Sequence, residues 1–186
     1  MRQGAAWLAV TALLAGCATT PQRTVVDTRA ENVGHQRLPP AAGGGSGVVQ
    51  AYEMQPGEGY RMPQLYAGPD PVVGARDPRT ELAPTTVCLQ VVVDAEGRVE
   101  RSVPLSDREV CKPGVAAENA PLLAAAQEAV AQWRYTPAAV CHFAAGKVPD
   151  NRGDCTAAER IEPVAVSLLY AFTFEIVHGR QVVERR

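Results

Sequence analysis

Long apolar runs, an excess of basic residues and clustered histidines are all missing from this chain of 186 residues. No stretch approaches the roughly 20 apolar residues that a membrane-spanning helix needs, which excludes a protein that crosses a bilayer several times. The 18 basic and 20 acidic side chains give a net charge of -2, whereas nucleic-acid-binding domains usually carry a basic surface. We therefore expect neither a polytopic membrane protein nor a nucleic-acid partner.

Catalytic motifs are also missing. The three histidines, His35, His142 and His178, are scattered along the chain, without a Ser/His/Asp order, a paired-carboxylate cluster or a nucleophile elbow. Cys141 stands beside His142 and could be an activated thiol, but a disulfide accounts for this cysteine better. The sequence therefore predicts a protein that is not an enzyme, with no catalytic residue, no cofactor and no metal site.

The N-terminus carries an export signal. Arg2 is the only charge before residue 23, and an apolar run follows from Ala5 to Leu14. Such a start is typical of a secretory signal peptide. The next residues complete the string Leu14-Ala15-Gly16-Cys17, which resembles the lipobox of bacterial lipoproteins and implies cleavage after residue 16 and lipidation of Cys17. Ala18 in place of aspartate implies an anchor in the outer membrane, facing the periplasm.

Cysteine usage is consistent with export. If Cys17 carries lipid, four cysteines remain, which suits two disulfides in an oxidising compartment. Four cysteines allow three pairings, and we favour Cys88–Cys111 with Cys141–Cys155, because each bridge closes a local loop. A zinc site is the alternative, although the short paired spacings of structural zinc motifs are missing.

The rest of the chain divides by composition. A low-complexity stretch around Gly43–Gly47 predicts a flexible tether, and the proline density after it disfavours helices and central strands. The expected parts are a signal peptide at 1–16, the lipidated cysteine and tether at 17–62, a proline-rich lead-in at 63–84, a folded domain at 85–178 with a disulfide-stapled insertion at 138–163, and a polar tail at 179–186.

Within the domain, hydrophobic periodicity predicts strand, strand, helix, strand. Strands are expected from Thr85 to Val93, from Arg98 to Leu105 and from Val164 to Val177, the first two joined by a turn at Asp94–Gly97. A helix capped by Asn119 is expected to end before Pro137. The predicted fold class is α+β, a three-stranded antiparallel sheet with one helix packed on it. The expected core residues are Val87, Leu89, Val91, Val93, Leu122, Val130, Trp133, Tyr170 and Phe172.

Two motifs give residues 85–177 a family resemblance. The strand ending Val91-Val92-Val93-Asp94 precedes Glu96-Gly97-Arg98-Val99, and the helix ends in the string Trp133-Arg134-Tyr135-Thr136-Pro137. Together with the alternating last strand, these features resemble the C-terminal domain of the energy transducer TonB. The resemblance implies the β-β-α-β arrangement and contact with a partner protein, in transducers by pairing a partner segment with a sheet edge.

The resemblance also implies a site and partners. The expected partner-binding residues at the sheet edge are Val164, Val166, Ser167, Leu169, Ala171 and Thr173. A lipidated start replaces the spanning helix of transducers, so the implied role is recognition of an envelope protein, such as an outer-membrane transporter. An accessory role in TonB-dependent transport and a structural envelope role are the alternatives. An exposed edge also allows two copies to pair as a homodimer.

Overall fold

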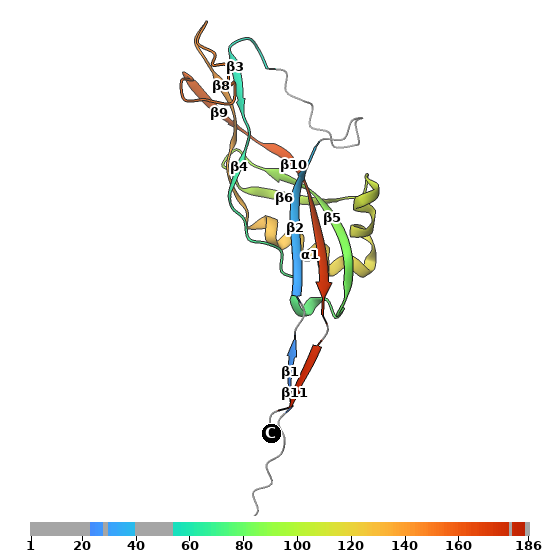
Figure 1. The fold of residues 1–186 in the computed structure, drawn as a ribbon. Coiled ribbons are helices and arrows are strands. Elements are labelled where there is room, and N and C mark those ends of the chain that lie inside the picture. Colours follow the sequence, from blue (N-terminus) through green and yellow to red (C-terminus); the bar gives the residue numbers. More distant parts are fainter. Residues whose placement is uncertain (1–22, 28–29, 40–53, 179, 185–186) are drawn as a thin grey trace, which may run out of the picture.

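The computed structural model of this chain describes residues 23–27, 30–39, 54–178 and 180–184. These residues form eleven strands, one α-helix and three short 3-10 helices (Figure 1). The strands are β1 (Arg23–Asp27), β2 (Ala30–Leu38), β3 (Glu58–Arg61), β4 (Gln64–Ala67), β5 (Leu82–Val93), β6 (Val99–Leu105), β7 (Arg134–Thr136), β8 (Ala138–His142), β9 (Arg160–Val164), β10 (Val166–Val177) and β11 (Arg180–Glu184). The helices are η1 (Gly74–Arg76), η2 (Glu109–Val115), η3 (Ala117–Asn119) and α1 (Ala120–Ala131).

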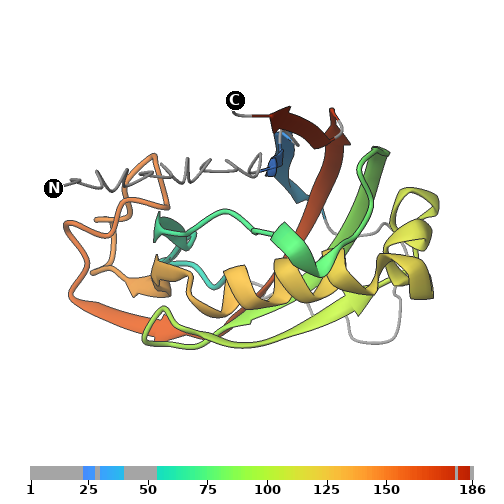
Figure 2. The same cartoon turned by 90° about the horizontal axis from the view of Figure 1, so that it is seen from below.

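A four-stranded antiparallel sheet forms the centre of the fold, in the order β2-β10-β5-β6. β10 is an inner strand, because it pairs with β5 on one side and with all nine residues of β2 on the other. Helix α1 lies along one face of this sheet, against β5 and β6 (Figure 2). The alternating apolar residues of β5 and β10 point toward the helix and fill the space between the two layers.

The turn between β5 and β6 is fixed by its own side chains. The Asp94 carboxylate accepts hydrogen bonds from the backbone N–H groups of Glu96 and Arg98, at 3.0 and 2.7 Å, and from the Arg98 guanidinium. The bonds from Arg98 lower the pKa of Asp94. Gly97 adopts a φ of 81°, and a Cβ there would collide with the carbonyl of Tyr135. Glycine is therefore required at this turn for both its conformation and its size.

Helix α1 begins differently from the expectation. The Asn119 side chain makes no capping hydrogen bond. Its Nδ2 donates to the Pro113 carbonyl at 2.8 Å, and its Oδ1 accepts from Arg79 at 2.9 Å. Arg79 is in turn paired with the buried Asp77. Asn119 thus ties two loops to the start of the helix, and the predicted cap is wrong.

The helix ends at Ala131, where Arg134 Nη1 donates to the carbonyls of Ala131 and Trp133 at 3.3 and 2.8 Å. Trp133 is fully buried, and its indole N–H donates to the Pro69 carbonyl at 2.9 Å. All nine residues expected in the core belong to the main buried cluster around Trp133. The periodicity of the apolar side chains therefore located the centre of the domain.

A second region lies beyond one end of the central sheet (Figure 1). There β3, β8 and β9 form a three-stranded antiparallel sheet, and β4 pairs with β7 next to it. β1 and β11 form a separate two-stranded pair. We call the sheet of β3, β8 and β9, with the loop 143–159 between β8 and β9, the arm.

The expected three-stranded β-β-α-β unit is wrong. The protein is mostly β, with a fourth central strand and a second sheet. The fourth strand, β2, lies in the expected tether, and the expected insertion contains β8 and all of β9 except its last residue, Val164, which was expected to begin the last strand. The folded part begins well before Thr85, because β2 completes the sheet that the later strands leave open on one side.

Candidate interaction edge

The four predicted disulfide cysteines form the two predicted bridges. Cys88 of β5 is bonded to Cys111 of η2, with their Cα atoms 5.3 Å apart. Cys141 of β8 is bonded to Cys155, with their Cα atoms 5.6 Å apart. The preferred pairing is therefore confirmed, and both bonds suit an oxidising compartment. Cys17 lies outside the described residues.

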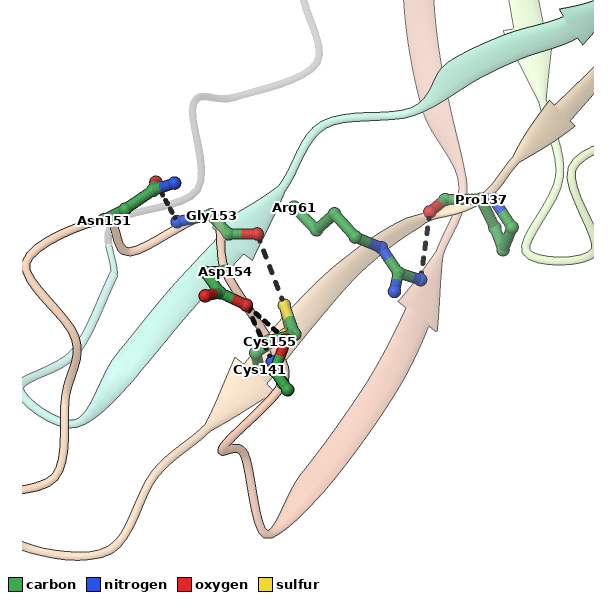
Figure 3. The surroundings of a disulfide bond; sticks show 8 residues. Arg61, Pro137, Cys141, Asn151, Gly153, Asp154 and Cys155 are labelled. Carbon is green, nitrogen blue, oxygen red and sulfur yellow. Dashed lines mark hydrogen bonds between the residues drawn. A yellow bond between two sulfur atoms is a disulfide. The ribbon is translucent and has the colours of Figure 1, made fainter.

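The two bridges have different surroundings. Cys88–Cys111 packs on the sheet face away from α1, in a small cluster with Ala171, Leu38 and Leu105. Cys141–Cys155 closes the loop of the arm (Figure 3).

A tight turn precedes Cys155 in this loop. Asp154 N–H donates to the Asn151 carbonyl at 2.9 Å, and Gly153 N–H donates to the Asn151 side chain at 3.0 Å. The Cys141–Cys155 bridge therefore closes a local loop that also contains a hydrogen-bonded turn.

Cys141 is not an activated thiol, because it is oxidised. Its neighbour His142 lies 3.5 Å from Glu58 and 3.2 Å from Glu162, and Arg160 donates to Glu162 at 2.6 Å. The hydrogen bond from Arg160 is the main reason that the pKa of Glu162 is lowered. We interpret this group as an ionic network across β3, β8 and β9.

The predicted partner-binding edge needs correction. Leu169, Ala171 and Thr173 lie in β10 opposite Leu38, Gln36 and Gly34 of β2, so this part of β10 is not an edge. Ala171 is also buried. Val164 belongs to β9 and pairs with Ala138, while Val166 and Ser167 pair with β5 beyond the end of β2. The predicted edge is wrong because β2, which precedes the expected domain in the sequence, pairs with β10 and covers it.

The outer strands of the central sheet are β6 and β2. The backbone of β6 and of the turn before it makes two contacts with the chain around α1. Tyr135 N–H donates to the Gly97 carbonyl at 2.8 Å, and Gln127 reaches the Ser102 carbonyl at 3.5 Å. Pro104 has no N–H to offer a further strand. β6 is therefore poorly suited to pairing with another chain.

The outer edge of β2 is open within the described part of the chain. β2 is nine residues long, and β10 is the one described strand with which it pairs. The β2 residues that pair with core-facing residues of β10 lie on the helix side of the sheet. One of them is His35, whose ring packs against Trp133 with 5.3 Å between the ring centroids. The outer strands of the arm are shorter, and β9 contains Pro163. An unpaired strand edge of this length is a template for another chain.

A pocket of about 620 Å³ lies beside β2. Three of the residues that line it are acidic, Glu31, Asp70 and Glu175, and others are apolar. Glu31 accepts a hydrogen bond from the Gly74 N–H at 3.0 Å, and Asp70 lies 3.6 Å from His35 Nδ1. Val72 in the wall is 67% exposed. The open strand edge thus adjoins an acidic pocket with an exposed apolar side chain.

Comparison with known proteins gives no relative: the chain matches no family model, no curated protein and no solved structure. The resemblance to TonB therefore stays a hypothesis from sequence. No helix in the described ranges is long and apolar enough to cross a membrane. Within the same ranges, no three His, Cys, Asp or Glu side chains are placed to hold a metal ion.

The sequence reasoning missed the whole of β2 and its pocket. Residues 30–38 contain only a few apolar side chains, and an outer strand that is mostly exposed needs no more. A weak signal was available in the valine and leucine at positions 33 and 38 among polar neighbours. That signal does not identify a strand without knowledge of β10 as its partner.

Proposed function

We propose that this protein is an exported, lipid-anchored protein of the bacterial envelope whose domain binds another protein chain at the outer edge of β2. It is a recognition module and not an enzyme. The observation that carries the proposal is the open nine-residue edge beside the acidic pocket. Backbone N–H and C=O groups on such an edge supply affinity for an extended chain, and the neighbouring pocket supplies selectivity.

The anchor is supported by the cysteines. Four of the five cysteines in the sequence pair with one another in the described residues, and the fifth is Cys17 at the end of the lipobox-like string. Acyl chains at this position attach the protein to a membrane surface. In this proposal the described residues face the periplasm, where disulfides persist.

Site-specific photocrosslinking tests the recognition surface. A photoreactive residue replaces Gln36 on β2 in one variant and Gln132 at the end of α1 in the other, since both glutamines are exposed. We expect the Gln36 variant to form protein adducts in intact cells, with the adduct mapped to a defined segment by mass spectrometry. Equal adduct patterns from both positions, or none from Gln36, would contradict the proposal.

Membrane fractionation tests the anchor separately. Cys17→Ser removes the atom that the acyl chains need, so we expect the variant to move from the membrane fraction to the soluble fraction. Cys88→Ser serves as the control, because it removes a cysteine that is bonded inside the domain. An unchanged distribution of the Cys17→Ser protein would exclude lipid anchoring at this residue.

A further inference from the structure

We propose that the chain on the outer edge of β2 is a second copy of this chain, and that the two β2 strands pair antiparallel about Gly34. This inference rests on the proposed function, since it names the partner of the same edge. It would join two four-stranded sheets into one sheet of eight strands. Because directly opposed residues point to the same face of an antiparallel pair, both helices would lie on the same side.

The order of charges along β2 supports self-pairing. With Gly34 opposite Gly34, Glu31 of one copy lies opposite Arg37 of the other, and this contact occurs twice by symmetry. Both residues lie opposite core-facing residues of β10, on the helix side of the sheet. Opposite charges at directly opposed positions favour a strand pair.

Other registers lose this match. If one β2 strand slides by two residues along the other in either direction, both helices still lie on the same side of the sheet, but Glu31 then lies opposite His35 or Pro39. In the same two shifts, Arg37 lies opposite residue 29 or Val33. A register centred on Gly34 is therefore the one that pairs both charges.

The acidic pocket provides a second reason. It is lined by Glu31, Val33 and Gly34 of β2 and by Asp70, which lies near His35 on the helix side of the sheet. In the proposed register, the second copy's Arg37 lies next to Glu31 at this pocket. An exposed guanidinium from the other chain would thus meet Glu31, with Asp70 in the same pocket, and such charge complementarity helps to set register at interfaces.

Gly34 itself is unexplained by the single chain. Its φ is outside the left-handed region, and a Cβ at this position would meet nothing within 4 Å. Glycine weakens a strand and often marks a close approach of another backbone. The centre of a two-fold strand pair is such a place.

Cysteine crosslinking tests this register in the full-length exported protein. Directly opposed residues of an antiparallel pair have Cα atoms about 4.5–5.5 Å apart, which a disulfide can span. We expect Gly34→Cys to give a disulfide-linked species at twice the monomer mass on a non-reducing gel. Gln36→Cys is the matched control, because the two copies of residue 36 would be roughly 13 Å apart along the strand. The parent chain, which retains Cys17, sets the baseline.

Charge exchange tests the contact independently. In the Gly34→Cys background, Glu31→Arg alone and Arg37→Glu alone each place like charges together, so the dimer yield should fall severalfold. Co-expression of the two variants with different tags pairs opposite charges again, and the mixed dimer should recover. Thermal unfolding of each variant checks folding, since Glu31 also accepts from Gly74. Arg37 is exposed and provides the cleaner single change.

The outcomes separate this inference from the proposed function. Equal dimer yields from Gly34→Cys and Gln36→Cys, or no recovery in the mixed pair, would overturn the self-pairing. Gly34→Cys adducts with a different chain would overturn it too, while the recognition edge would stand. If Gly34→Cys forms no adduct and the Gln36 photocrosslinker also gives none, both proposals fail.

Discussion

The two outer strands of the central sheet meet their surroundings in opposite ways. β6 is held by the residues around it: the chain after α1 bonds to its hairpin, a glutamine of α1 reaches its backbone, and a proline interrupts its donors. β2 comes from the N-terminal segment and has no described strand on its outer side. One sheet thus has one outer strand with several backbone contacts and one outer strand with no described strand beside it, and our proposal places the binding surface at β2.

Two glycines, one near each edge, test this difference most strongly. Gly97→Ala forces a left-handed conformation on a residue with a Cβ and drives that Cβ into the Tyr135 carbonyl. We expect the free energy of unfolding to fall by about 2–4 kcal/mol. Gly34→Ala is the control, and its open surroundings predict a change within about 1 kcal/mol. Chemical denaturation measures both, and equal losses would refute the comparison.

The packing beneath β2 gives the next effect. Trp133→Phe removes the N–H that binds the Pro69 carbonyl and leaves a space between α1 and the His35 ring. We expect a loss of about 2 kcal/mol in unfolding free energy. Hydrogen exchange should rise more in β2 than in β6, because β2 depends on this ring. A uniform rise across both strands would count against the assignment.

The ring contact itself should contribute less. His35→Ala removes the side chain that covers Trp133 from β2, and aromatic contacts of this kind contribute about 0.5–1.5 kcal/mol. Val103→Ala is the matched change on β6, at an exposed position. Thermal melts of the two variants should differ, with His35→Ala the less stable. The opposite order would show that β2 adds little to the domain.

The sequence predicts the central elements of the fold better than its outer strand β2. β5, β10 and α1 carry long apolar periods, so their places and the burial of Trp133 could be read directly. The disulfide pairing followed from short loop closure at Cys88–Cys111 and Cys141–Cys155. β2 was missed because its pairing with β10 joins segments that are far apart in the chain, and an exposed edge strand needs few apolar residues. The predicted binding edge on β10 was wrong for the same reason, because a strand is an edge only if no other strand pairs with its outer side.

The smallest effect concerns the hairpin that leads into β6. Hydrogen bonds from the backbone and side chain of Arg98 hold the pKa of Asp94 below its ordinary value. A lowered carboxyl pKa stabilises the folded state above the ordinary value of about 4, and this contribution disappears as the pH falls through the folded pKa. Asp94→Asn should therefore unfold more easily than the parent at pH 6, and this difference should shrink as the pH is lowered below about 4. A difference that stays the same as the pH is lowered from 6 to well below 4 would exclude the charge as its cause.

Hydrogen exchange as a function of protein concentration most directly tests the contrast between the edges. If β2 binds a second copy, backbone amides in residues 30–38 should gain protection as the concentration rises, while those in residues 99–105 stay the same. Arg37→Glu should abolish the gain. Protection of residues 30–38 that is independent of concentration would contradict self-pairing at β2, and a parallel gain in both strands would contradict the contrast between the two edges.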